Sequence, residues 1–228
     1  MKKFVLASLL ASFLLAEGVM VGSAGGYKKP MIKIVEDARA QGVKVDPTFG
    51  HPKQMLAQVV AGGKDYGIVV GDDLFLKKQK EVKISEFKTL GKGVLVFVSN
   101  KDVKSLNEIP NLKVAYPQPK KTIYGKCAAQ TLKSLNLKPK ESLEVGFVPQ
   151  VSTYVKNGDV DAGFINLTEA IAQKGNFKTQ IIVPENLYQV PNIVAAVLPA
   201  CEGNKECDKF LNILTNEKSS KIFKSYGL

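Results

Sequence analysis

The feature that most constrains this chain is a regular alternation of short apolar runs with helix-like segments. Three runs in the first third, "GVMVGSA", "VKVDPTF" and "YGIVVGDD", have the length and composition of buried strands. In the segments between them, apolar residues recur every three or four positions, and glycines end each segment. Strands that alternate with helices form right-handed βαβ units, so the pattern predicts a parallel sheet covered on both faces.

A second alternating run follows the apolar segment "KGVLVFVSN". Its expected strands are "LKVAYPQP", "LEVGFV", "VDAGFIN", "TQIIV" and "NIVAAVLPA", and the chain closes with one helical pattern, "KECDKFLNILTNEKSSKIFKSYGL". We therefore expect an α/β protein of two lobes, each a mostly parallel sheet flanked by helices. In this division residues 17–93 and 197–228 form lobe I, and residues 94–196 form lobe II.

The N-terminus has the pattern of an export signal. Two lysines precede an apolar run from Phe4 to Ala16, about 13 residues long, which is too short to span a bilayer and typical of a signal-peptide core. We predict that residues 1–16 are a cleaved signal peptide and that the mature protein is soluble and periplasmic.

The chain is basic, with a net charge of +11. A positive balance raises nucleic acid as a partner, but the lysines are dispersed and no basic-aromatic motif is present. The charge therefore indicates a generally basic surface. We expect a monomer with no nucleic-acid partner and no cofactor.

The chain has three cysteines. Cys201 and Cys207, in "CEGNKEC", enclose a short polar loop and are expected to form a disulfide in an oxidising compartment. Cys127 lies in a helical pattern and is expected to be a buried small residue rather than a nucleophile.

Ligands of open α/β sheets bind outside the carboxyl ends of the strands. Turns follow the expected strands at residues 22–27, 49–52, 71–73, 118–124, 148–151 and 165–167. If the lobes face each other, these turns line one cleft. The first, "GSAGGY", is either a tight turn that needs glycine for a positive φ or a cradle of backbone N–H groups for an anion. The other turns on the same cleft favour ligand contact.

Four segments carry a resemblance to a known family. They are "VKVDPTFGHPKQMLAQVVAGGKDYGIVVGDD", "LKVAYPQPKKTIYGKCAAQTLKSLNL", "VPQVSTYVKNGDVDAGFINLTEA" and "SSKIFKSYGL". In this order they resemble the periplasmic molybdate-binding proteins of ABC importers, which are two-lobed type II solute-binding proteins. The resemblance implies an oxyanion such as molybdate or tungstate between the lobes, held by serine hydroxyls and helix-start N–H groups, and an inner-membrane permease as partner.

Carried over by position, the resemblance implies five contacts with the anion. They fall at Gly25, Gly26 and Tyr27; at Gly50 and His51; at Thr122, Ile123 and Tyr124; at Gln150 and Val151; and at Asn166. The first two turns lack the serines of the family. Backbone N–H groups and the side chains of Tyr27, His51 and Asn166 are the donors that remain.

Three of the polar residues have competing interpretations. Asp72 and Asp73 have the position of helix caps for "LFLKK", and Tyr124 packs against its lobe or faces the ligand. If His51 and Asp72 converge with Tyr27 or Tyr124, a transition-metal site becomes a second binding hypothesis.

No common catalytic motif occurs. The chain has no G-x-S-x-G, no Walker loop, no H-E-x-x-H and no C-x-x-C. We therefore expect a binding protein rather than an enzyme. The alternatives are a receptor of the same fold for a metal ion, a metal complex or another small anion, and a signalling or assembly subunit without a transport role.

Overall fold

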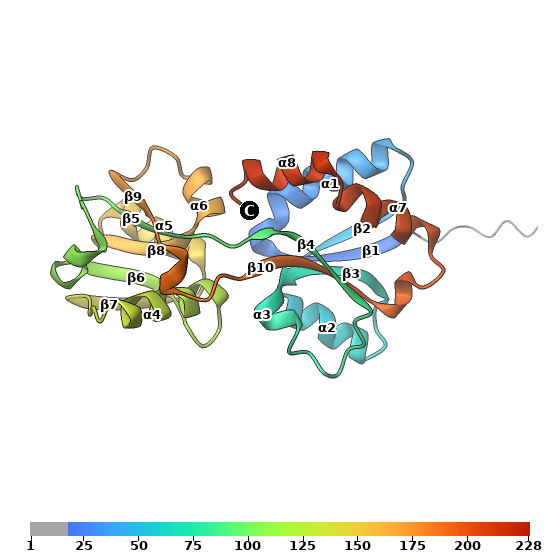
Figure 1. Cartoon of the computed structure of the whole chain (residues 1–228), viewed down its shortest axis with the longest axis horizontal. Helices are drawn as coiled ribbons and strands as arrows, with labels where there is room; N and C mark the ends of the chain where they lie inside the picture. The colour runs from blue at the N-terminus through green and yellow to red at the C-terminus, as the bar shows by residue number, and fades with distance from the viewer. Residues whose placement is uncertain (1–17) are drawn as a thin grey trace, which may run out of the picture.

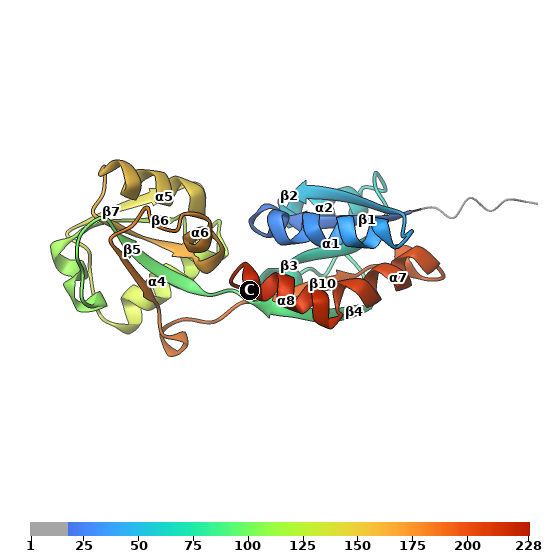
Figure 2. The ribbon, with the colours of Figure 1, turned by 90° about the horizontal axis from the view of Figure 1, so that it is seen from above.

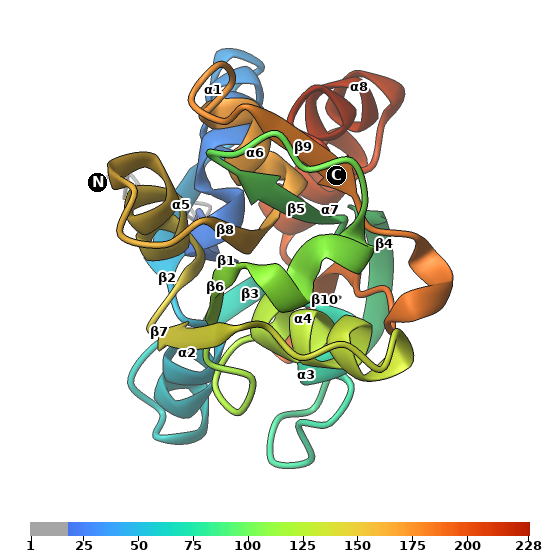
Figure 3. The same ribbon diagram turned by 90° about the vertical axis from the view of Figure 1, so that its left-hand side faces the viewer.

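The computed structural model describes residues 18–228, so the predicted signal peptide lies outside the described residues. Two five-stranded sheets, each with helices on both faces, form two lobes that lie end to end (Figures 1 and 2). Figure 3 looks along the long axis with lobe II in front of lobe I. This is the two-lobed α/β architecture that the alternating pattern predicts.

Lobe I contains a sheet of strand order β2-β1-β3-β10-β4. Its strands are β1 (Val19–Ala24), β2 (Val45–Gly50), β3 (Tyr66–Asp72), β4 (Glu86–Lys92) and β10 (Asn192–Val197). Its helices are η1 (Gly25–Tyr27), α1 (Lys28–Ala40), α2 (Pro52–Val60), α3 (Asp73–Leu76), η4 (Pro199–Cys201), α7 (Lys205–Leu214) and α8 (Glu217–Ser225). β1 is parallel to β2 and β3, whereas β10 is antiparallel to both β3 and β4.

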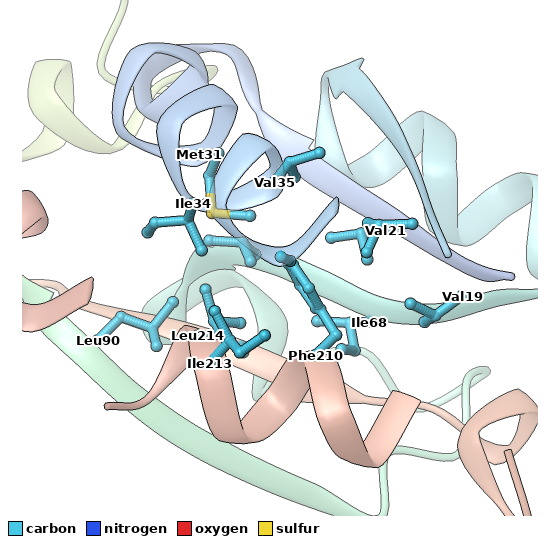
Figure 4. Close-up of a cluster of buried hydrophobic side chains, with 14 of the residues drawn as sticks. Val19, Val21, Met31, Ile34, Val35, Ile68, Leu90, Phe210, Ile213 and Leu214 are labelled. Atoms are coloured by element: carbon cyan, nitrogen blue, oxygen red, sulfur yellow. The ribbon is translucent and has the colours of Figure 1, made fainter. Parts of the chain in front are cut away.

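The larger core of lobe I lies between its sheet and the helices α1, α7 and α8. Met31 and Ile34 of α1 meet Phe210 of α7 over Val21 and Ile68 of the sheet (Figure 4). Burying side chains of this size contributes about 1.5–3 kcal/mol each. The helices α2 and α3 cover the opposite face of the sheet. The sheet is therefore packed on both faces, and the helix starts lie at its edge.

Lobe II contains a sheet of strand order β7-β6-β8-β5-β9. Its strands are β5 (Leu95–Ser99), β6 (Lys113–Pro117), β7 (Glu141–Val145), β8 (Ala162–Asn166) and β9 (Thr179–Ile182). Its helices are η2 (Leu106–Asn111), α4 (Ile123–Ser134), α5 (Val148–Asn157), α6 (Leu167–Ala172) and η3 (Glu185–Leu187). β6 is parallel to β7 and β8, and β5 is antiparallel to β8 and β9.

Strand β5 shows why lobe II has two cores. Leu95 and Phe97 join the cluster with α4, whereas Val96 and Val98 join the cluster with α5 and α6. Successive side chains of a strand point to opposite faces of the sheet, so a continuous apolar run fits a strand that is covered on both sides.

The chain passes between the lobes twice, at residues 93–94 and just before β10. The N–H group of Gly93 donates a hydrogen bond of 2.8 Å to the carbonyl of Pro191, which ties the two crossings together. A Cβ atom on Gly93 would lie 2.7 Å from the Pro191 ring and 2.8 Å from the hydroxyl of Tyr124. Only glycine fits at this crossing without a shift of its neighbours.

The second crossing comes earlier than the sequence predicts. Residues 192–196 were expected in lobe II, but they belong to β10, which pairs with β3 and β4 of lobe I. Lobe II therefore spans residues 94–191.

Two secondary-structure predictions were also wrong. The strand β4 was not predicted, because its position at the edge of the sheet tolerates the charged sequence "EFKTLGK". The single C-terminal helix is two helices, because Asn216 caps α8 by accepting a hydrogen bond of 2.8 Å from the N–H group of Ser219.

The three cysteines differ in state. Cys201 and Cys207 are joined by a disulfide, with their Cα atoms 5.5 Å apart. Cys127 is free and fully buried, and burial raises the pKa of its thiol to about 12. A thiol that stays protonated at neutral pH is a packing group rather than a nucleophile.

Within residues 18–228, no helix has the length and apolar character that a membrane crossing requires.

Candidate ligand-binding cleft between the lobes

A cavity of about 800 Å³ lies between the two lobes. Its wall includes the starts of η1–α1, α2 and α3 from lobe I and of α4, α5 and α6 from lobe II. Each of these helices follows the carboxyl end of a strand, from β1 to β3 and from β6 to β8. The first N–H groups of a helix have no partner within the helix, and the helix dipole is positive at that end. The cavity therefore collects helix starts, with their positive dipole ends, from both lobes.

Nine of the eleven residues implied by the resemblance line this cavity. They are Gly25, Gly26, Tyr27, Gly50, His51, Thr122, Ile123, Tyr124 and Asn166. The other two do not line it. Val151 is buried in the core of lobe II, and the Oε1 atom of Gln150 accepts a hydrogen bond of 2.8 Å from the N–H group of Gly146.

The contribution of α5 comes instead from the very start of that helix. Phe147, Val148 and Pro149 line the cavity there. The turn at residues 148–151 was expected at the cleft, and Val148 and Pro149 of that turn line the cavity. Phe147 was not expected, because an apolar residue before a helix has no polar side chain to mark it.

Gly25 and Gly26 are not explained by the tight-turn interpretation. Neither residue is among the glycines with positive φ. A Cβ atom on Gly25 would meet nothing within 4 Å, and one on Gly26 would meet only the Nδ2 atom of Asn166, at 4.0 Å. Because they have no side chains, the two glycines leave the backbone of the η1 turn uncovered beside the cavity.

The polar side chains of lobe I at the cavity are engaged as helix caps. The Nδ1 atom of His51 accepts a hydrogen bond of 3.3 Å from the N–H group of Lys53, at the start of α2. The Oδ1 atom of Asp72 accepts one of 2.8 Å from the N–H group of Phe75. Burial raises the pKa of the Asp72 carboxyl above its ordinary value.

The metal hypothesis was made for His51 and Asp72 together with Tyr27 or Tyr124. His51 and Asp72 both line the cavity. In the part of the chain that the structure describes, however, no three His, Cys, Asp or Glu side chains are grouped so that they could hold a metal ion.

Asp73, predicted with Asp72 as a cap, holds the second crossing. Its carboxylate accepts hydrogen bonds of 2.9 and 3.1 Å from the N–H group and the side-chain amide of Asn192, at the start of β10. Burial alone would raise the pKa of Asp73, but the bonds from Asn192 and Lys77 outweigh it, and the pKa is lowered. Asp73 thus anchors β10 to lobe I.

In lobe II, the cap of α4 is also engaged. The hydroxyl of Thr122 accepts a hydrogen bond of 3.0 Å from the N–H group of Gly125 and donates one of 3.0 Å to the carbonyl of Gln118. Asn166 caps α6 through Oδ1, which accepts a hydrogen bond of 3.0 Å from Glu169, and this leaves its Nδ2 group toward Gly26.

Two hydroxyls at the cavity differ from all of these. Tyr124 and Thr168 line the cavity and are only 6% and 7% exposed. Within residues 18–228, the Thr168 hydroxyl has no hydrogen-bond partner, whereas the Tyr124 hydroxyl lies beside the side chains of Tyr27 and Asn166. Thr168 was not predicted, because its sequence context does not show that its hydroxyl is unpaired.

Both tyrosines at the cavity keep their protons. Burial raises the pKa of Tyr124 far above its ordinary value. Burial, together with the neighbouring Tyr124 and Asp72, raises the pKa of Tyr27. At neutral pH each phenol is therefore a hydrogen-bond donor rather than an anion.

The charges around the cavity are mostly positive. The lysines that line it are Lys28, Lys29, Lys78, Lys120, Lys121 and Lys126. The carboxylates that line the cavity are those of Asp72 and Glu169. A cleft lined by an excess of one charge attracts ligands of the opposite sign.

Two facing lobes with a ligand-sized cavity between them are the arrangement of a two-lobed binding protein, because ligand pockets form preferentially at domain interfaces. The chain belongs to the bacterial extracellular solute-binding protein family, whose sequence profile matches residues 19–228. A curated relative is the ABC transporter substrate-binding lipoprotein YvgL of Bacillus subtilis, which is 24% identical over 200 residues. The match covers 82% of this chain and 76% of that protein.

Solved structures confirm the fold. The periplasmic molybdate-binding protein of Azotobacter vinelandii superposes with a TM-score of 0.74 at 20% identity, over 92% of this chain and 97% of the other. Phospholactate-bound PEB3, a Campylobacter jejuni protein, superposes with a TM-score of 0.66 at 17% identity, over 92% and 98%. The predicted resemblance to molybdate-binding proteins and the two-lobed fold are therefore confirmed.

Proposed function

We propose that this protein is the periplasmic substrate-binding protein of an ABC importer, that it binds a small oxyanion with molybdate and tungstate as first candidates, and that it is a receptor rather than an enzyme. Residues 1–16 would direct export and be removed, and an inner-membrane permease would take the ligand. The observation that carries the proposal is the convergence of six helix starts on one interlobe cavity. A desolvated anion gains from aligned amide dipoles and from charge-assisted hydrogen bonds.

Binding is coupled to a hinge motion in this proposal. The lobes are joined by two crossings at residues 93–94 and 191–192, tied by the bond between Gly93 and Pro191. Two short linking segments suit a hinge closure around a ligand. The ligand brings acceptors to both lobes, and the closed arrangement is the form that a permease would recognise.

A larger organic anion is the second candidate, and the cavity volume favours it. A tetrahedral oxyanion has the volume of roughly three water molecules, about 100 Å³. The cavity holds about 800 Å³, and apolar side chains such as Phe75 and Phe147 line part of it. Pockets of this size and character hold organic ligands. The phospholactate of PEB3 is an organic anion in a protein of the same fold.

A ligand panel tests the proposal. Purified protein would be titrated by calorimetry and thermal shift with molybdate, tungstate, sulfate, phosphate, phospholactate and divalent metals. An oxyanion at 100 times its dissociation constant should stabilise the fold by about 2.7 kcal/mol. Stabilisation by metals alone, lost in His51→Ala, would make the oxyanion assignment wrong. No stabilisation by any of these probes would favour a subunit without a transport role.

A further inference from the structure

Phe147 is an aromatic side chain that the fold leaves uncovered at the cavity. Of the phenylalanines and tyrosines within residues 18–228, it alone is exposed, with 55% of its surface open. It lines the cavity, and it belongs to none of the hydrophobic clusters of the described residues. The other exposed large apolar side chains in this part of the chain do not line the cavity; they are Val60, Leu143, Ile171 and Ile182.

Phe147 also stands where a helix normally has a polar residue. It is the N-cap of α5, and no side chain caps that helix. Four other helices at the cavity have caps that accept a hydrogen bond, from His51, Asp72, Thr122 and Asn166. Helices favour Ser, Thr, Asp or Asn at this position because an apolar residue leaves the first N–H groups without an acceptor. Departures from such local rules are expected at functional sites.

The turn that carries Phe147 is fixed by its own bonds. The Oε1 atom of Gln150 accepts a hydrogen bond of 2.8 Å from the N–H group of Gly146, on the other side of Phe147. The N–H group of Gln150 donates one of 3.2 Å to the carbonyl of Phe147, and the ring of Pro149 restricts the first turn of α5. The phenyl ring is therefore presented by a rigid turn, so a contact with it costs little ordering.

Sheet order places this turn at the mouth of the cleft. Phe147 follows β7, which is an edge strand of lobe II, whereas the two crossings between the lobes adjoin β5, β4 and β10. In Figure 3, β7 and the edge strand β2 of lobe I lie on the left and β4 lies on the right. The ring therefore stands on the side of the cavity that is remote from the crossings, where a ligand enters.

The corresponding ring of lobe I is already packed. Phe75 meets His51 edge to face, with ring centroids 6.4 Å apart, and packs against the core of its lobe. The ring contacts of the described residues include none with Phe147. A bare oxyanion has no apolar surface to cover this ring, and its volume of about 100 Å³ leaves most of the 800 Å³ cavity unfilled. An anion with a carbon skeleton does both.

We propose that Phe147 is a specificity-determining residue that contacts the carbon skeleton of an organic anion, so that the ligand is an organic phosphate or carboxylate with an apolar group. The helix starts and the excess of lysines at the cavity attract the anionic group, and the apolar group covers the ring. This inference rests on the proposed function, because it requires an anion in the interlobe cavity, and it selects the second of the two candidate ligands. The contact is apolar and differs from the amide contacts implied for the turns.

The test compares anions that differ only in an apolar group. Calorimetry would pair inorganic phosphate with phenyl phosphate and acetate with benzoate, and would include molybdate and phospholactate. The wild type should bind the aromatic member of a pair at least tenfold tighter. Phe147→Ala should weaken binding of that member about tenfold, as expected when about 60 Å² of apolar contact is lost. Its affinity for the small member should change by less than twofold.

Two control variants separate contact from stability. Phe147→Leu keeps an apolar side chain and should bind the aromatic anion within about threefold of the wild type. Ile182→Ala removes a side chain of lobe II that is 62% exposed and lies outside the cavity, and it should keep the wild-type affinity. Phe147→Ala itself should melt within about 2 °C of the wild type, because the ring packs against no core.

The outcomes distinguish the inference from the proposed function. Equal weakening of both members of a pair in Phe147→Ala would show that the ring closes against lobe I rather than on a ligand, and would overturn the inference. A wild type that binds molybdate or phosphate but gains nothing from an apolar group would overturn the inference alone. If the wild type binds none of these anions, the proposed function fails instead.

Discussion

The two lobes share one architecture and face one cavity, but they place different side chains at it. In each lobe, a parallel βαβαβ unit places three helix starts at the cavity edge. In lobe I the η1 turn has two glycines followed by the phenol of Tyr27, and His51 and Asp72 are engaged as caps. In lobe II, Thr122 and Asn166 are engaged as caps, and the Thr168 hydroxyl is left without a partner.

The difference shows that the fold determines the position of the binding site, whereas single side chains determine which ligand binds there. The position of the cavity follows from strand order and helix direction. The donors depend on single side chains, and those differ between lobes built in the same way. This agrees with the use of one fold for molybdate in one relative and for phospholactate in another.

The largest expected difference between the lobes is in the stability lost when a glycine at a helix start is replaced by alanine. Gly125→Ala in lobe II places a Cβ atom 2.1 Å from the Pro117 carbonyl and should lower the free energy of unfolding by about 3 kcal/mol. The matched change in lobe I, Gly25→Ala, meets nothing within 4 Å and should change it by less than about 0.5 kcal/mol. Denaturant unfolding measures both. Equal losses would show that the η1 turn is not an open cradle.

The next effect concerns the disulfide, which belongs to lobe I alone. Reduction of the bond between Cys201 and Cys207, which are six residues apart, should lower the free energy of unfolding by about 2 kcal/mol, as expected for a short loop. Denaturant unfolding with and without reductant measures this. The variant Cys127→Ala in lobe II should show the same dependence on reductant. If the effect of reductant disappears in Cys127→Ala, it comes from Cys127 in lobe II and not from the disulfide of lobe I.

Asp72 provides a test of the electrostatics of lobe I. Asp72→Asn removes a negative charge from the cavity wall and should strengthen the binding of a doubly charged oxyanion about tenfold. Burial raises the pKa of this carboxyl, so its protonation as the pH falls should also strengthen binding in the wild type. Calorimetry with sulfate, which does not titrate between pH 4 and 8, measures the dependence. A pH dependence that persists in Asp72→Asn would exclude Asp72 as its source.

The smallest effect is expected at His51. Its Nδ1 atom caps α2, so His51→Ala should cost about 0.5–1 kcal/mol of stability. Anion affinity should fall by about twofold or less, because the Nδ1 atom of His51 is occupied as a helix cap. The variant His51→Asn retains a good cap and should restore the stability. A loss of affinity above tenfold in both variants would place a ligand donor in lobe I and contradict the comparison.

The sequence predicted the fold because most elements carry local signals. Continuous apolar runs mark the buried strands, and glycine or a capping residue marks the helix ends. The strand β4 carries no such signal, since an exposed edge strand tolerates charged residues. The division of the lobes was misplaced at residues 192–196, because an apolar strand does not show which sheet it joins.

The site was predictable only at the level of turns. Helix starts after strands are visible in the sequence, and nine of the eleven implied residues line the cavity. Gln150 and Val151 do not line the cavity, because Val151 turns into the core and the Gln150 side chain accepts a hydrogen bond from the N–H group of Gly146. Thr168 was missed because a hydroxyl becomes informative only when its surroundings provide no acceptor, and that is a property of tertiary structure.

The path of the chain has a consequence for folding. Lobe II is one continuous segment, residues 94–191, whereas lobe I needs both ends of the chain to complete its sheet through β10. Joining β10 to β3 in an unfolded chain closes a long loop, which is entropically costly. Once lobe II has folded, its two ends are held together by the bond between Gly93 and Pro191. The loop that lobe I must close is then short, so the inserted lobe assists the assembly of the lobe that surrounds it in sequence.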